Sequence, residues 1–263
     1  MSLIKSKVIK PKSDTSGVAD MPITEHLIEL RARLIKICIA IGIALVPMLF
    51  YFQEIYSLFA QPLLDALPPE SRIIAPELLA GFMAQVQLCI LLAIFLVIPY
   101  ILYQVWSFVA PGLYKHEKRI AVPILLSSIV LFYLGISFCY FVILQRALMF
   151  LVNVLPATVV SMPDMKDYLQ FATKMLMAFG LAFEIPVVVF VRVASGVVSI
   201  DSLKDKRRYV IVGCFAVAGV MSPPDVPSMF MLALPMMLLF ELGLFMAGMF
   251  VKPKPSIPTE QVG

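Results

Sequence analysis

Long stretches without a charged residue alternate with short polar segments along most of this chain. The run from Ile37 to Gln53 contains no charge over 17 residues. At about 1.5 Å per helical residue, such a run nearly crosses a hydrocarbon core of about 30 Å. Similar runs follow, and the pattern predicts an all-α membrane protein with six transmembrane helices. The predicted spans cover about residues 37–53, 82–104, 122–144, 168–191, 209–221 and 227–250.

The fifth of these runs is much shorter than a normal span. Only 13 residues, Tyr209 to Met221, separate Arg208 from the turn Ser222–Asp225. They make about 20 Å of helix, well below the thickness of the core. The sequence therefore predicts a short fifth span.

The polar segments before the first and after the last run complete the predicted organisation. Residues 1–21 carry scattered lysines, with no apolar stretch of the kind that a cleavable signal peptide needs. We expect them to form a disordered cytoplasmic tail. From Pro22 to Lys36, leucines recur every three or four residues between charges, which predicts an amphipathic helix lying at the membrane interface. Residues 22–252 are then one membrane domain, and residues 253–263 form a second cytoplasmic tail.

Composition and charge support this interpretation and give it an orientation. Apolar residues make up 61% of the chain and charged residues 14%, whereas soluble domains are about 25% charged. With the predicted spans, 17 of the 21 lysines and arginines fall on the side that holds both termini. Cytoplasmic loops carry the excess of basic residues, so both termini are predicted to be cytoplasmic.

Signatures of enzymes are missing from the sequence. It has no phosphate-binding loop, no zinc-protease motif and no hydrolase nucleophile motif. The four cysteines lie singly in apolar runs, which predicts neither a disulfide nor a metal site. His26 and His116 lie in charged segments and are expected to be solvated. We therefore predict no catalytic residues, no cofactor and no metal.

Two acids lie among basic residues near the cytoplasmic side. Glu29 precedes Arg33 by four residues, and Glu117 lies in the stretch from Lys115 to Arg119. Spacing alone favours ordinary surface ion pairs, each contributing a few tenths of a kcal/mol.

Three acids and one base lie within the apolar runs or in the turn between the last two runs. Glu184 and Glu241 lie well inside spans four and six. A charge at such a depth costs about 2.5–3.5 kcal/mol, so each should face a partner, a water-filled cavity or another helix. Asp225 suits a simple turn as well as a binding role. Lys174 lies near enough to the outer end of span four to extend its amine to the interface.

Four motifs in one order resemble those of a known family. They are residues 26–34 (HLIELRARL), 103–119 (YQVWSFVAPGLYKHEKR), 179–186 (FGLAFEIP) and 222–226 (SPPDV). The chain resembles TatC, the multispanning receptor subunit of the twin-arginine protein translocase, from about Pro22 to Lys252. The resemblance implies a concave, glove-like bundle with short spans five and six, in the bacterial cytoplasmic membrane.

The resemblance also implies a function and partners. The family binds signal peptides that carry paired arginines on already folded proteins, and it assembles with small single-span subunits (TatB-like and TatA-like). Transport is driven by the proton-motive force. Further copies of the chain and membrane lipids are expected partners, and nucleic acid is not.

Site residues follow by position in the matching motifs. The family's signal-peptide site corresponds to Glu29, Arg31, Arg33, Phe108, Leu113, Lys115, Glu117 and Arg119. Pro62 matches a sensitive outer-loop position, Glu184 an acid facing the concave cavity, and Asp225 an outer cap near the partner contact. Glu241 is expected to face a partner or the cavity.

The sequence departs from the family pattern at two positions and leaves one alternative function. Met229 stands where a polar residue is expected, and Lys174 is an unexpected charge in span four. The alternative is a proton-coupled secondary transporter of a small solute, with Glu184 or Glu241 as proton carrier. The absence of an internal repeat in the sequence disfavours it.

Overall fold

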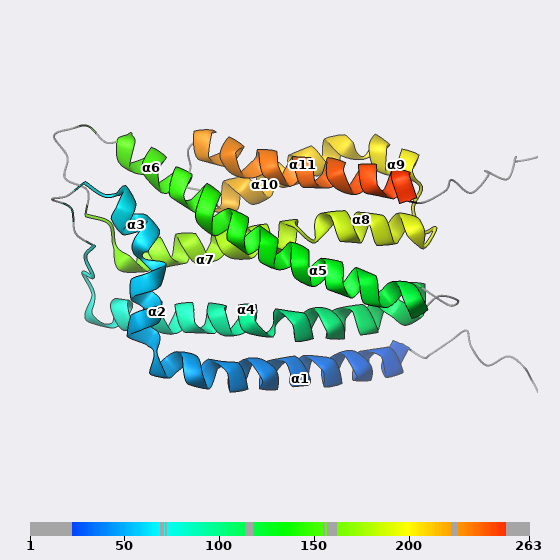
Figure 1. Ribbon diagram of the computed structural model, residues 1–263, viewed down its shortest axis with the longest axis horizontal. Coiled ribbons are helices and arrows are strands. Elements are labelled where there is room, and N and C mark those ends of the chain that lie inside the picture. The colour runs from blue at the N-terminus through cyan, green and yellow to red at the C-terminus, as the bar shows by residue number, and fades with distance from the viewer. Residues whose placement is uncertain are drawn as a thin grey trace, which may run out of the picture.

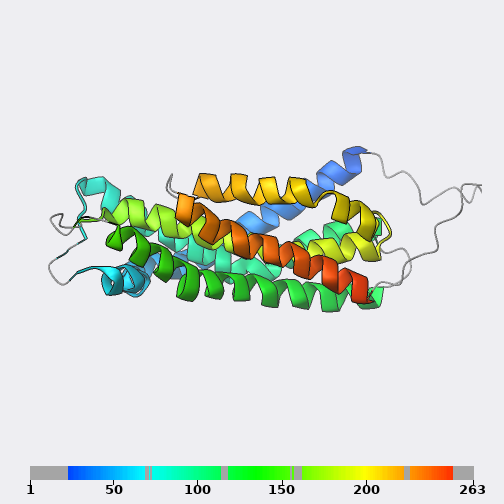
Figure 2. The same ribbon diagram turned by 90° about the horizontal axis from the view of Figure 1, so that it is seen from above.

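The computed structural model describes residues 23–68, 71, 73–113, 118–154, 156, 162–221 and 226–250. Within these residues all regular structure is helical, apart from one isolated backbone bridge between Ile74 and Asp164. In the described part of the chain, five helices or runs of consecutive helices are long and apolar enough to cross a membrane. They are Leu27–Phe50, Leu79–Phe108, Ala121–Asn153, Met165–Ala194 and Met229–Met249. The predicted all-α membrane class is therefore confirmed, and the described helices form an elongated bundle (Figures 1 and 2).

Helix α1 (Ile23–Phe50) lies beside α4 (Leu78–Leu113) along most of its length (Figure 1). The sequence pattern predicted an interfacial helix followed by a separate span, but α1 is continuous through Lys36. No glycine or proline stands near that position, so nothing interrupts the backbone hydrogen bonds there. Helix α4 has 36 residues and extends beyond the predicted second span at both ends.

Two short helices follow α1 at the end of the bundle opposite to the start of that helix. They are α2 (Phe52–Phe59) and α3 (Gln61–Ala66). Tyrosines anchor them: the Tyr168 hydroxyl donates a 2.8 Å hydrogen bond to the carbonyl of Phe59. Pro62 is buried in the first turn of α3, where a proline fits without loss of a helical hydrogen bond.

The third span extends beyond residue 144, where the sequence predicted its end. Helix α5 (Lys118–Phe138) runs through a π-helical segment (Cys139–Leu144) into α6 (Gln145–Asn153). The prediction that this span ends at about residue 144 is therefore wrong. The first proline beyond the span is Pro156, and α6 presents Ala147 and Leu148 to the core, which favours continued helix.

Helices α7 (Met165–Ala182) and α8 (Ile185–Ala194) form the most buried span. They are separated by a break at Phe183–Glu184, and Pro186 lies in the first turn of α8. Helix α7 packs against α4 and α5, where close contacts depend on small residues. A Cβ atom on Gly180 would lie 2.8 Å from the ring of Phe132, a fully buried side chain.

The last helices are α9 (Ile200–Asp205), α10 (Arg207–Met221) and α11 (Val226–Phe250). Helix α10 has 15 residues, about 22 Å, so the short fifth helix is confirmed. Helix α11 has 25 residues, about 37 Å, and the prediction of a short sixth span is wrong. The residues of α11 are apolar apart from Ser228 and Glu241, so no run of polar residues interrupts the helix.

The two ends of the bundle differ in their basic residues. One end of the bundle contains the start of α1, the end of α4, the start of α5, the end of α8 and the end of α11 (Figure 1). The arginines near that end include Arg33 in α1, Arg192 in α8 and Arg207 at the start of α10. Arg146 and Lys166 lie toward the opposite end, in α6 and at the start of α7.

We predict that Gly180→Ala lowers stability, because the added methyl group meets the buried Phe132 ring. Overpacking of this kind costs about 1–3 kcal/mol. The matched control is Gly248→Ala in α11, where an added Cβ meets nothing within 4 Å. Thermal unfolding of both variants in detergent should show a loss only for Gly180→Ala, and equal melting temperatures would contradict this packing.

Candidate functional site

A cluster of three predicted residues joins α1 to α4 at the basic end of the bundle. The Arg33 guanidinium donates to Glu29 Oε1 at 2.5 Å and to the backbone carbonyl of Gln104 at 2.8 Å. It also lies over the Phe108 ring, 5.8 Å from the ring centroid. The structure thus brings Glu29, Arg33 and Phe108 together.

Helical periodicity explains why these residues meet. Glu29 and Arg33 are four residues apart, and so are Gln104 and Phe108, so each pair lies on one face of its helix. The side chain of Arg33 is 17% exposed and that of Glu29 is 39% exposed. The sequence predicted the ion pair within α1, but not that Arg33 also bonds to α4. No spacing rule connects residues 71 positions apart.

The remaining residues of the predicted signal-peptide site are placed less fully. Arg31 is exposed on α1, on the side away from Arg33. Leu113 ends α4, and Arg119 is the second residue of α5. Lys115 and Glu117 lie outside the described residues.

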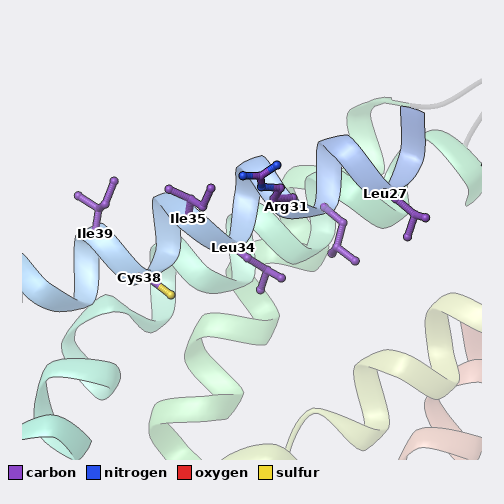
Figure 3. Close-up of a pocket in the computed structure, with 7 residues that line it drawn as sticks. Leu27, Arg31, Leu34, Ile35, Cys38 and Ile39 are labelled. Atoms are coloured by element: carbon purple, nitrogen blue, oxygen red, sulfur yellow. The ribbon is translucent and has the colours of Figure 1, made fainter. Parts of the chain in front are cut away.

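An apolar groove runs along the face of α1 that points away from Glu29 and Arg33. It has a volume of about 550 Å³ and is lined by Leu27, Leu30, Arg31, Leu34, Ile35, Cys38 and Ile39. Figure 3 shows these side chains following one another along α1, with Arg31 the one charged group among them. Cys38 is exposed, whereas the other three cysteines are buried. The groove could hold an extended or helical apolar segment.

A buried polar group lies deeper, between α4, α5 and the break in span four. Glu184 precedes α8 directly, and its Oε1 atom is buried without a partner among the described residues. The side chain of Ser128, which is fully buried, lies next to this carboxyl group. Ser128 also accepts a 3.0 Å hydrogen bond from Trp106 Nε1.

Sequence reasoning identified Glu184 but missed Ser128 and the contact with Trp106. A lone tryptophan and a serine inside an uncharged run were signals that could have suggested a buried polar network. Their pairing depends on how α4 and α5 pack, which the sequence pattern did not give.

Glu241 pairs with a base on a neighbouring helix. Arg207 Nη2 lies 2.7 Å from Glu241 Oε2, and both side chains are about half exposed. The pair joins the start of α10 to α11. Glu241 therefore has a partner within the chain, which satisfies one of the conditions expected for an acid in a span.

Two further predicted positions have different outcomes. Asp225 lies outside the described residues, so its predicted role in the outer cap stays a prediction. Lys174 is exposed on α7 and forms no ion pair within the described residues. Those residues contain no group of three or more histidine, cysteine, aspartate or glutamate side chains that could hold a metal ion.

Comparison with known proteins gives one consistent result. A family described as "Sec-independent protein translocase protein (TatC)" matches residues 25–235. A protein of that name from Azotobacter chroococcum mcd 1 is 44% identical over 236 residues, which cover 90% of this chain and 91% of the relative. The namesake from Escherichia coli K12 is 42% identical over 230 residues, covering 88% and 89%. A crystal structure titled "Twin Arginine Translocase Receptor- TatC" aligns with a TM-score of 0.78 at 34% identity, covering 85% of this chain and 98% of the other.

We predict that breaking the pair between Arg207 and Glu241 loosens α10 from α11. Arg207→Glu and Glu241→Arg should each lower the melting temperature in detergent, by an amount that corresponds to about 1 kcal/mol for a half-exposed pair. The double reversal should recover most of the loss because it restores opposite charges. A double variant no more stable than either single variant would contradict a direct pairing.

Proposed function

The chain belongs to the TatC family of Sec-independent protein translocase proteins, and from this premise we propose that it binds paired-arginine signal peptides at the α1–α4 cluster. As a member it is a receptor component of a protein translocase and not an enzyme. The observation that supports the proposed site is the arginine already bound by Glu29. This carboxylate accepts a guanidinium beside the aromatic face of Phe108, and an apolar groove runs along another face of the same helix.

The chemistry of the cluster favours arginine over lysine in a ligand. A guanidinium is planar and can form two parallel hydrogen bonds with one carboxylate, whereas an ammonium group cannot reproduce that fork. Glu29 is exposed enough to be reached from solvent. We propose that one ligand arginine competes with Arg33 for Glu29, and that Glu117 receives the second.

The apolar part of the signal peptide would occupy the groove along α1. The groove begins level with the charged cluster and continues through Leu34 and Cys38 toward the membrane interior. Two arginines followed by an apolar segment would match this order of charged and apolar surface. Leu113, Lys115 and Arg119 are proposed to complete the site from the connection between α4 and α5.

We propose six spans, with α10 as the fifth, in the bacterial cytoplasmic membrane. Basic residues near the shared end of α1, α4, α5, α8 and α11 support a cytoplasmic location of that end and of both termini. The proposed shape remains a concave, glove-like bundle. No observation supports the alternative of a proton-coupled solute transporter.

Partner subunits are proposed to dock on α10 and α11. Helix α10 exposes apolar side chains that a neighbouring apolar helix could cover: Ile211, Val212, Val217 and Val220. Met229 lies beside Gly219, which makes the start of α11 apolar at a position where the family pattern led us to expect a polar residue. Single-span TatB-like and TatA-like subunits and further copies of this chain are the proposed partners, with Asp225 and Pro62 near the outer contact.

Crosslinking of a paired-arginine signal peptide to membranes is the direct test of this function. The peptide should crosslink near residues 29 and 117 of the wild type. Glu29→Ala and Glu117→Ala should each lose most of the crosslink, because each leaves one guanidinium without its carboxylate. A peptide with two lysines should not crosslink.

The matched control is Asp201→Ala, which removes an exposed acid of α9 that pairs with Lys204. It should crosslink like the wild type. Equal crosslinking of the wild type and both glutamate variants would exclude the proposed site.

Labelling of Cys38 tests the groove separately. A lipid-soluble maleimide should label Cys38 and not the three buried cysteines. Bound paired-arginine peptide should slow this labelling several-fold, and the two-lysine peptide should not. As a control, Ile43→Cys in a Cys38→Ser background places a thiol on the exposed part of α1 beyond the groove, where the peptide should have no effect. Unprotected Cys38 with bound peptide would place the apolar segment elsewhere.

The length of α10 provides a further prediction. A 15-residue helix is shorter than the hydrocarbon core, and mismatch thins or distorts the bilayer at a cost of fractions of a kcal/mol per Å. We propose that this thinning helps a folded cargo to cross. Inserting four leucines into α10 should therefore reduce transport, whereas Ala216→Leu, at an exposed position of the same helix and without lengthening, should not. Undiminished transport by the lengthened variant would count against the idea.

A further inference from the structure

One turn of α4 contacts Arg33 of α1 on one side of the helix and Ser128, which lies next to Glu184, on the other side. Gln104 and Phe108 hold the Arg33 guanidinium of α1. Trp106 lies between them in sequence, about 200° around the helix from both. Its ring packs with Ile124 of α5 and with a buried valine pair of α8.

The indole N–H of Trp106 is the first step of a polar connection toward the membrane interior. It donates to Ser128 Oγ at 3.0 Å, and the carboxyl group of Glu184 lies next to the Ser128 side chain. Ser128 is 0% exposed, so its hydroxyl group is shielded from solvent. The Oε1 atom of Glu184 is buried and lacks a partner among the described residues.

We propose that Trp106 and Ser128 are positioning residues that couple occupancy of the Glu29–Arg33 site to the hydrogen bonding of Glu184. This inference rests on the proposed function, because the ligand is the paired-arginine peptide. It assigns to α4 the role of the rigid element that both sites contact.

The two states differ in the partner of Glu29. Without ligand, Glu29 accepts from Arg33, and Arg33 also holds Gln104 and Phe108. A ligand arginine competes for the same carboxylate, so Arg33 loses one of its anchors and its hold on α4 changes. The turn from Gln104 to Phe108 then shifts, and Trp106 moves relative to Ser128.

A small displacement is sufficient for an effect at Glu184. A buried carboxylate oxygen without a partner is costly, so the group responds strongly to any change in its hydrogen-bond donors. If Trp106 withdraws from Ser128, the serine hydroxyl is free to reorient toward or away from the carboxylate. Coupling of this kind needs differential contacts in two states, and the competition at Glu29 supplies them.

The protein carries its own reporter of this motion, because Trp106 is its only tryptophan. The full chain is purified in lipid nanodiscs, and a tryptophan-free paired-arginine peptide is added. Peptide binding should shift the emission of Trp106, since the indole changes its hydrogen bond. A two-lysine peptide should neither bind nor shift the emission.

Ser128→Ala separates the coupling from binding. It removes the hydroxyl while leaving the α1 surface intact, so the peptide should still bind. Most of the emission response should vanish, and transport should fall at least about fivefold, the lower end of typical allosteric coupling. The matched control is Ser127→Ala, whose hydroxyl donates only to the carbonyl of Ile124 in its own helix. That variant should respond and transport like the wild type.

Trp106→Phe provides a second route that does not depend on fluorescence. It keeps an aromatic ring in the same packing and removes the N–H donor, so it should bind peptide and transport poorly. Normal transport by this variant would overturn the coupling, as would a Ser128→Ala response equal to that of the wild type.

Experiments on the wild type alone distinguish a failure of the coupling from a failure of the proposed receptor function. Peptide binding without any change in Trp106 emission rejects the coupling and leaves the proposed receptor function standing. Failure of the peptide to bind the wild type rejects the receptor site, and the coupling falls with it.

Discussion

A single guanidinium, that of Arg33, determines how the functional end of this protein is built. It bonds to a carboxylate on its own helix, to a backbone carbonyl on α4 and to an aromatic face on α4. Three contacts to one planar group fix the rotation of α1 relative to α4 at the end where charge meets the membrane. They also keep Glu29 in a geometry that suits another arginine. The same interaction therefore stabilises the unliganded receptor and defines what a ligand must displace.

Tight packing of the helices behind Glu29, Arg33 and Phe108 holds these residues in one arrangement. Helix α7 lies at the centre, and its contacts with α5 depend on the absence of side chains at Gly180 and Gly135, where an added Cβ atom would lie 2.8 Å from its nearest neighbour. Backbone N–H and C=O groups find no water in the hydrocarbon core. They must therefore pair with each other, which favours long continuous helices. One buried polar contact joins α4 to α5, that of Trp106 with Ser128, and Glu184 lies next to it.

The sequence pattern predicted the features that depend on local composition. Charge-free runs located the helices, the short run before the proline turn predicted the length of α10, and four-residue spacing predicted the pair of Glu29 with Arg33. The pattern failed where neighbouring helices decide the outcome. It divided α1 at Lys36, where a change from amphipathic to apolar sequence has no backbone signal. It also ended the third span before α6, and it missed Ser128, because a serine in an apolar run gives no indication of its partner.

The claim that the Glu29 carboxylate binds a ligand arginine is best tested by a double-mutant cycle. Dissociation constants are measured for a paired-arginine peptide and its single-lysine versions, each with the wild type and with Glu29→Gln. A charged hydrogen-bonded pair predicts a coupling of about 1.5–3 kcal/mol, a factor of more than tenfold, between Glu29 and one of the two arginines. Additive effects at both arginines would contradict the claim and place the recognition of the paired arginines elsewhere on the receptor.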